Sequence, residues 1–116
     1  MTSNQYYFRV KYKNLTTDIK LSNSLRCDIK FKQDLSNKFV FSLHPTFETL
    51  SEESIVGDDW EALDSGTALI SKPIFSDNNN YYNLIRQRVF VGAIAFFASA
   101  DSKIAEIEVI EILNEI

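Results

Sequence analysis

The sequence has little of several residue types on which many catalytic and secreted proteins depend. It has one cysteine, one histidine, three glycines and two prolines among 116 residues. A single cysteine excludes an internal disulfide and a multi-cysteine metal site, and a single histidine excludes a multi-histidine metal site. No P-loop or glycine-rich dinucleotide fingerprint is present. The low glycine and proline content also excludes a linker or a fibrous chain.

The chain also lacks an apolar run long enough to cross a bilayer, which takes ~20 residues. Its one long unbroken apolar segment is 89–98, VFVGAIAFFA, which polar residues close at both ends. β-branched and aromatic residues dominate this segment, and Gly92 lies inside it, which disfavours a helix. We expect a central strand over 89–98, buried on both faces, with Gly92 and Ala93 allowing a neighbouring element to pack closely.

What is present is typical of one globular domain. Hydrophobic residues make up 45% of the chain and aromatic residues 13%. This content suits a folded core and, with many β-branched residues, favours β structure. We expect a single domain over 1–116 with residues 1–5 disordered. The polar N-terminus, MTSNQ, is not a signal peptide, so the chain is either cytosolic or a mature domain without its export signal.

Charge is unevenly distributed, although the net charge is only −4. Residues 1–43 contain eight lysines and arginines against three acidic residues, a net +5; residues 44–116 contain four against thirteen, a net −9. A uniformly basic nucleic-acid binder does not fit this distribution. It favours two surfaces of opposite sign that orient docking on a partner, with strands that merely carry solvated charges as the alternative.

Alternating apolar and polar residues predict most of the secondary structure as strands. Strands are expected over 6–13, 25–33 and 104–112, with weaker extended segments over 18–22 and 60–71. A C-terminal helix remains an alternative for 104–116. Pro45 and the apolar spacing from Phe47 predict one or two helical turns around 46–54. The fold class is therefore all-β, a two-sheet β-sandwich with a short helical insert.

Candidate catalytic residues are few. His44 precedes Pro45 and is expected in a loop, with a general base as the alternative. Cys27 lies in an alternating strand and is expected to be a small core residue, with a reactive thiol as the alternative. An acidic cluster, Glu52, Glu53, Asp58 and Asp59, is expected to be solvated; metal-dependent hydrolysis through Asp58 and Asp59 is the rival hypothesis.

Exposed connections are the better candidates for function, because loops on a rigid scaffold commonly carry recognition. Residues 14–24 form a long polar connection that contains a glycosylation sequon at Asn14, and residues 76–80 form an exposed turn. Tyr81 and Tyr82 beside asparagines could form a sugar platform, although ordinary core aromatics fit them as well. A non-enzymatic binding module is the expected class.

Three motifs in a fixed order resemble one family, the outer-membrane lipoprotein of the type VI secretion system, called TssJ. Residues 28–33, DIKFKQ, stand where that family has an Arg-aliphatic-Tyr-Gln-Leu-like strand end. Residues 47–50 followed by 55–59 stand where it has an aromatic-rich helical insert and a Leu-Gly-Asp-Asp-like turn. Residues 90–97, FVGAIAFF, resemble its aromatic-Val/Ile-Gly-Val-Val-Ala-Ala-aromatic strand.

The resemblance implies a transthyretin-like sandwich of two four-stranded sheets in the periplasm. It also implies an anchor in the outer membrane through a lipid on a cysteine that the given sequence does not contain, since Cys27 lies inside an expected strand. It also implies binding to the periplasmic domain of the inner-membrane component TssM through the loop after the first strand. By position, the expected partner-binding residues are Asn14, Thr16, Thr17, Asp18, Lys20, Ser22 and Asn23. No cofactor, metal, nucleic acid or small-molecule substrate is expected. An immunity protein or a carbohydrate-binding domain of the same architecture is the alternative.

Overall fold

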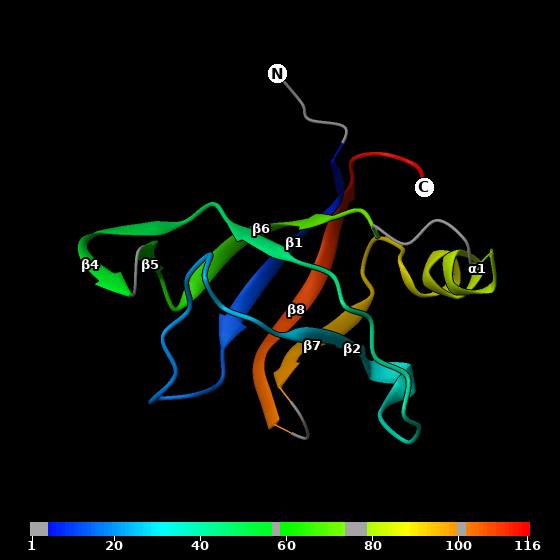
Figure 1. Ribbon diagram of the computed structural model, residues 1–116, viewed down its shortest axis with the longest axis horizontal. Helices are drawn as coiled ribbons and strands as arrows, with labels where there is room; N and C mark the ends of the chain where they lie inside the picture. The colour runs from blue at the N-terminus through cyan, green and yellow to red at the C-terminus, as the bar shows by residue number, and fades with distance from the viewer. Residues whose placement is uncertain (1–4, 57–58, 74–78, 100–101) are drawn as a thin grey trace.

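The computed structural model describes residues 5–56, 59–73, 79–99 and 102–116 as two antiparallel sheets with one α-helix and one 3₁₀ turn (Figure 1). Six strands form the main sheet in the order β2-β7-β8-β1-β6-β3, and β4 pairs with β5 in a small second sheet. The elements are β1 (Tyr6–Asn14), β2 (Asp28–Phe31), η1 (Lys32–Asp34), β3 (Pro45–Phe47), β4 (Leu50–Val56), β5 (Asp59–Ala62), β6 (Ser65–Ser71), α1 (Asn79–Arg88), β7 (Ile94–Ser99) and β8 (Ser102–Ile112). The expected all-β, sandwich-like fold is confirmed, and the expectation of disorder over 1–5 falls mainly on residues outside the described part.

Strand β1 lies near the centre of the main sheet, and its two faces meet different environments. Phe8, Val10 and Tyr12 are buried on one face, while Lys11 and Lys13 are exposed on the other. The alternation continues in β8, where Ile107 and Val109 are buried beside β1. Side-chain periodicity of two therefore places one apolar face against the core, as the sequence predicts.

The apolar face is covered by loops and a helix rather than by a second large sheet. The covering side chains are Leu21 from the loop after β1, Phe41 and Leu43 after η1, Phe47 from β3, and Ile85 and Val89 at α1. The Phe47 ring makes edge-to-face contacts with Tyr12 and Phe97 at centroid distances of 5.0 and 5.9 Å. Burial of each such large side chain contributes ~1.5–3 kcal/mol to the free energy of unfolding. The division into six and two strands differs from the two four-stranded sheets that the family resemblance implies.

The opposite face of β1 and β8 carries a ladder of opposite charges. The pairs in register are Arg9 with Glu111, Lys11 with Glu108 and Lys13 with Glu106. Arg9 contacts the carboxylates of both Glu111 and Glu48, and Lys11 lies 3.3 Å from Glu108. Basic β1 and acidic β8 thus neutralise each other across one sheet face. The expectation that the two halves form surfaces of opposite sign is wrong for these two strands.

The apolar segment 89–98 is only partly the buried strand that its composition predicts. Strand β7 begins at Ile94, and it is buried on both faces, with Ala95 and Phe97 on one side and Phe96 and Ala98 on the other. Residues 90–93 form a turn instead, closed by a hydrogen bond from the Ala93 amide to the Phe90 carbonyl. Phe90 and Val91 are 56% and 63% exposed.

Gly92 is needed for its backbone conformation and not for close packing. Its φ is +95°, which L-residues with a side chain rarely adopt, and no atom lies within 4 Å of where a Cβ would stand. The expectation that Gly92 lets a neighbour approach is therefore wrong. The turn that Gly92 permits connects the end of α1 to β7.

The helical insert expected around 46–54 is also wrong. That region contains most of β3 and most of β4, and the helix lies at Asn79–Arg88 instead. Pro45 pairs with Ile70, and Leu50 pairs with Ala62, so strand pairing outweighs the weak helical spacing of the apolar residues. Residues 104–112 lie in β8, which rejects the alternative of a C-terminal helix.

Two of the expected extended segments are shorter than predicted. Strand β2 begins at Asp28 and ends at Phe31, where η1 follows, and the segment 18–22 contributes one isolated bridge, between Ser22 and Glu61. Residues 60–71 are extended, as expected, and form most of β5 and all of β6; the turn lies at 63–64 and not at 64–66 as predicted, because Ser65 and Gly66 already belong to β6.

A buried ion pair fastens η1 to the end of α1. Asp34 is fully buried, and Arg88 donates to both of its carboxylate oxygens at 2.8 and 2.9 Å. The Asn37 amide donates a further hydrogen bond to the same carboxylate at 3.0 Å. Burial raises the pKa of Asp34, but the hydrogen bonds and charge of Arg88, with Asn37, outweigh it and bring the pKa below its ordinary value.

Gly92→Ala should lower the free energy of unfolding by about 1 kcal/mol, because alanine resists positive φ. Gly92→Asn should cost less, since asparagine tolerates such backbone angles better. Chemical denaturation of both variants measures the difference. A larger loss for the bulkier asparagine would show instead that space decides this position.

Asp34→Asn should lower the free energy of unfolding at neutral pH by about 3 kcal/mol, because it leaves Arg88 without its counter-charge. A carboxylate with a lowered pKa stabilises the fold above its unfolded pKa of about 3.9, and this contribution is lost as pH falls through the folded value. The gap between the wild type and Asp34→Asn should therefore narrow in acid. Denaturation across this pH range measures it, and a gap independent of pH would contradict the ionic origin.

Candidate functional site

The loop 14–24, which the sequence singles out for partner binding, is held in shape by its own first residue. The side-chain oxygen of Asn14 accepts hydrogen bonds from the Thr16 amide at 2.9 Å and the Thr16 hydroxyl at 2.7 Å. The Asn14 amide nitrogen donates to the Ile19 carbonyl at 3.0 Å. An asparagine that bonds to the backbone two residues on commonly forms such a turn. The side chain of Asn14, the asparagine of the sequon, is therefore engaged in hydrogen bonds within the loop.

The second half of the loop is fastened to β5. Leu21 is buried in the core, and its carbonyl accepts a hydrogen bond from the Ala62 amide at 2.6 Å. Ser24 donates to the carboxylate of Asp59. Lys20 lies 4.0 Å from Glu61, an exposed pair that contributes little to stability. The loop is therefore a preorganised surface feature that needs little further ordering on binding.

The seven expected partner-binding residues divide into two groups. Ser22 is buried, and Asn14, Thr16 and Asn23 are half-buried; Thr17, Asp18 and Lys20 are exposed. The buried and half-buried residues hold the loop: the Asn23 side chain, for example, accepts a hydrogen bond from the Phe47 amide at 2.7 Å. The surface available to a partner is Thr17, Asp18 and Lys20, joined by exposed Leu15, which the sequence reasoning passed over.

Beside this loop stand the paired strands β4 and β5, here called the arm (residues 50–56 and 59–62), which extend from one side of the main sheet (Figure 1). Ile55 and Trp60 are cross-strand neighbours on it, and they are 61% and 46% exposed. The base of the arm is pinned by the Tyr12 hydroxyl, which donates to the Leu63 carbonyl at 2.7 Å and lies 2.8 Å from the Thr49 hydroxyl. Sequence reasoning missed the arm because it expected a helix there.

The arm also contains most of the acidic cluster. Glu52 and Glu53 are exposed on β4. Asp59, on β5, accepts a hydrogen bond from the Ser24 hydroxyl, and Asp58 lies outside the described residues. Over residues 5–56, 59–73, 79–99 and 102–116, no three histidine, cysteine or acidic side chains are placed to hold a metal ion. Among the described members of the cluster, exposed Glu52 and Glu53 fit a solvated acidic surface, and Asp59 is engaged by Ser24.

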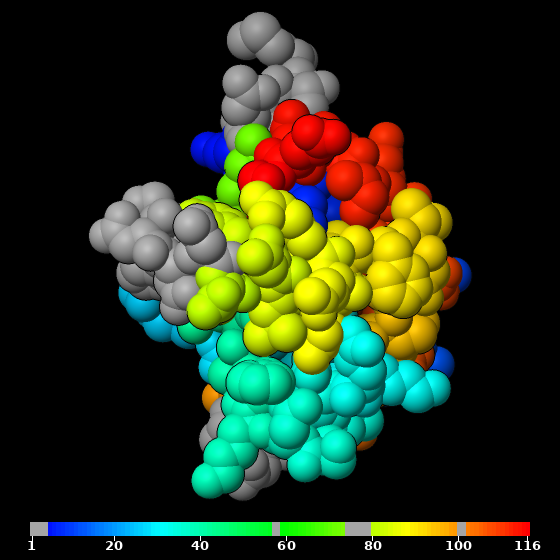
Figure 2. All heavy atoms as spheres, turned by 90° about the vertical axis from the view of Figure 1, so that its right-hand side faces the viewer, coloured from blue at the N-terminus to red at the C-terminus, as the bar shows by residue number. Residues whose placement is uncertain are grey.

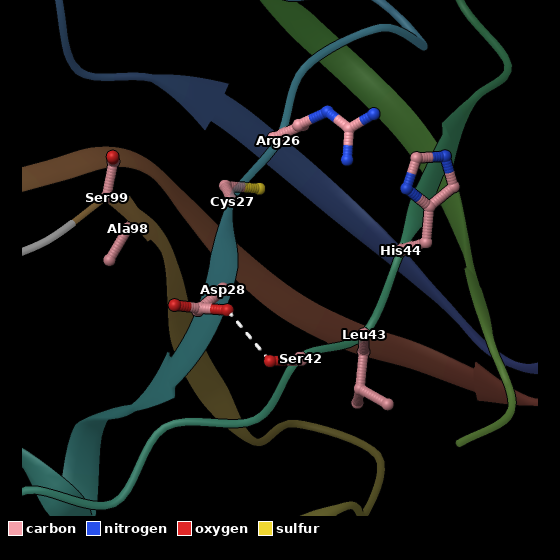
Figure 3. A pocket seen from close by; sticks show the side chains of 8 residues that line it. All are labelled: Arg26, Cys27, Asp28, Ser42, Leu43, His44, Ala98 and Ser99. Atoms are coloured by element: carbon pink, nitrogen blue, oxygen red, sulfur yellow. Dashed lines mark hydrogen bonds between the residues drawn. The ribbon is translucent and has the colours of Figure 1, made fainter. Parts of the chain in front are cut away.

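One pocket brings together the only cysteine and the only histidine of the chain (Figure 3). It has a volume of about 340 Å³, and its lining includes Arg26, Cys27, Asp28 and His44. The Cys27 thiol and the His44 ring face the same space, and Asp28 accepts a hydrogen bond from Ser42 at 3.1 Å. Burial, with the nearby charge of Asp28, raises the pKa of Cys27 to about 12.

That pKa decides how this pocket can act. A catalytic cysteine needs its thiolate near neutral pH, usually with a lowered pKa beside a cationic group. The raised pKa leaves little thiolate near neutral pH, and Cys27 packs partly buried against the core, which fits the small core residue that the sequence favours. His44 is exposed in a loop, as expected, and its carbonyl accepts a hydrogen bond from the Ser71 amide.

The tyrosines proposed as a sugar platform are also engaged in packing. Tyr81 lies in α1 with its ring 5.6 Å from Phe41 and 6.2 Å from Tyr82, and it packs against the core. Of the neighbouring turn 76–80, residues 76–78 lie outside the described part, and Asn79 and Asn80 begin α1. The packing of Tyr81 therefore fits an ordinary core aromatic better than a sugar platform.

Comparison with known proteins identifies no relative: no family model matches the chain, and no curated protein or solved structure matches it. Within the described residues, no helix has the length and apolar character that a membrane span requires.

Cys27 should react with iodoacetamide at pH 8 more than 100-fold more slowly than a free cysteine, because its raised pKa leaves little thiolate. Mass spectrometry of the alkylated protein over time measures the rate, with the protein in denaturant as the control that should react normally. A native rate equal to the denatured rate would contradict the raised pKa, and a native rate above it would mean an activated thiol and would reopen a catalytic role for this pocket.

Proposed function

We propose that this protein is a non-catalytic binding module that recognises another protein through the exposed part of loop 14–24. The observation that carries the proposal is the preorganisation of this loop, held by Asn14 at one end and by β5 at the other. A loop that is already ordered loses little conformational entropy on binding, so more of its contact energy appears as affinity. Loops on a rigid sandwich are also a common location for recognition.

The exposed residues of the loop give it a mixed character suited to a protein partner. Leu15 is a large apolar side chain at the surface, and Thr17, Asp18 and Lys20 surround it in sequence with polar and charged groups. An apolar anchor with a polar rim is the usual composition of a protein interface. The chemistry of the Cys27 pocket and of the acidic arm supports binding over catalysis.

In its specific form, the proposal is that the chain is the outer-membrane-tethered lipoprotein of a type VI secretion membrane complex. Its partner would be the periplasmic domain of the inner-membrane TssM-like component. What supports this form is the ordered set of sequence motifs over 28–33, 47–59 and 90–97, together with the all-β fold class that the resemblance implies. A periplasmic location and a lipid anchor are parts of the same proposal.

The test is a variant with Thr17→Ala, Asp18→Ala and Lys20→Ala, assayed against the periplasmic domain of a TssM-like protein from the same genome. We expect the affinity to fall roughly tenfold or more, as for loss of central interface contacts. Because these side chains are exposed, the melting temperature should not change. Biolayer interferometry and thermal denaturation measure the two quantities.

Gln87→Ala is the matched control, since Gln87 is exposed on α1, away from the loop. Wild-type affinity for the triple variant would refute the loop as the site. No binding by the wild-type protein would refute the secretion partner, and capture of a toxin or a glycan instead would favour an immunity protein or a carbohydrate-binding domain.

A further inference from the structure

Two surfaces at opposite sides of the molecule have opposite charge, and both expose large apolar side chains. The first is the arm, which lies on the left of Figure 1. The second surrounds η1 and the end of α1, on the right of Figure 1 and facing the viewer in Figure 2. We call this second surface the basic face, formed by residues 30–40 and 86–94.

The arm belongs to a stretch of sequence without positive charge. Residues 39–71 contain seven aspartates and glutamates and no lysine or arginine. Glu52 and Glu53 are exposed on β4, and no ion pair neutralises either of them within the part of the chain that is described. Beside them the Ile55–Trp60 pair exposes a large apolar area. The arm therefore presents an aromatic anchor inside an acidic rim.

The basic face has the complementary composition. One groove, of about 450 Å³, is lined by Lys32, Arg88, Phe90 and Ile94 among others. A second, of about 510 Å³, is lined by three lysines, Lys30, Lys38 and Lys103, with Leu35 and Val40. No acidic side chain lines either groove as described.

The buried ion pair explains why this face stays basic. Asp34, between the lysines in sequence, is fully buried and bonded to Arg88, so its charge does not reach the surface. Lys32 and Lys38 are exposed, and no carboxylate pairs with either among the described residues. Phe39 and Phe90 are more than half exposed beside them. Isolated exposed apolar residues are common, but grooves lined by several of them mark binding surfaces.

We propose that the arm of one copy of this chain docks in the grooves of the basic face of a second copy. The acidic rim would face Lys32 and Lys38, and Ile55 and Trp60 would enter the apolar floor beside Phe90. Opposite charges steer and orient such an encounter, and the aromatic anchors supply affinity. Because arm and basic face lie on opposite sides, one contact leaves both surfaces available for further copies, so the contact is head-to-tail.

The test uses charge reversal on exposed residues, which leaves the fold intact. The arm variant is Glu52→Lys with Glu53→Lys, and the face variant is Lys32→Glu with Lys38→Glu. Sedimentation velocity over a concentration series at low salt should show wild-type protein associating, and salt should weaken the association. Each variant alone should associate roughly tenfold or more weakly, because like charges then meet.

An equimolar mixture of the two variants should associate again, because every contact between unlike copies joins opposite charges. A third variant, Asp18→Lys with Glu115→Lys, changes the net charge as the arm variant does but replaces no residue of the arm or of the basic face, and it should associate like the wild type. Since Asp18 belongs to the partner-binding loop, this variant can lose the TssM-like partner while keeping self-association, which separates failure of the two proposals.

Three results would overturn the inference. Wild-type protein could stay monomeric at every concentration, the variants could associate as the wild type does, or their mixture could fail to recover. Binding of a monomeric wild type to phosphatidylglycerol-containing vesicles, lost with Lys32→Glu and Lys38→Glu but not with the arm variant, would assign the basic face to an anionic membrane instead.

Discussion

The structure depends on one constraint: the central strands β1 and β8 must bury one face and leave the other in water. Their alternation places Phe8, Val10 and Val109 on the buried face and an ion-pair ladder on the solvated one. The ladder makes the solvated face compatible with water and pairs the basic strand with the acidic strand in register. The loop after β1, the segment after η1, β3 and α1 cover the apolar face.

The way that face is covered determines where function can reside. The loop after β1 supplies Leu21 to the core, so its remaining residues are held at the surface in one conformation. The helix supplies Ile85 and Val89, and the Arg88–Asp34 pair fastens the helix to η1. Segments that first serve to cover the core thus also present a preorganised loop and a basic face.

What is left uncovered has a consistent chemistry. The acidic arm and the basic face each expose aromatic side chains, whereas the one pocket that holds Cys27 and His44 contains a thiol with a raised pKa. Exposed aromatic side chains beside unpaired charges suit the contacts with macromolecules that we propose for them. Under both proposals, the protein acts through contacts with other proteins, including copies of itself.

Local pattern in the sequence determined the all-β class, β1, β8, the buried part of β7 and the core role of Cys27, because period-two alternation and apolar runs act over a few residues. Tertiary structure decided the rest. Whether 46–54 became helix or strand depended on pairing with β5 and β6, and where the strand after α1 began depended on Gly92 turning the chain. Contacts with β5 decide which residues of loop 14–24 reach solvent. The ion pair between Asp34 and Arg88, 54 positions apart, decides which charges near η1 stay unpaired. Such long-range contacts leave no local signal in the sequence.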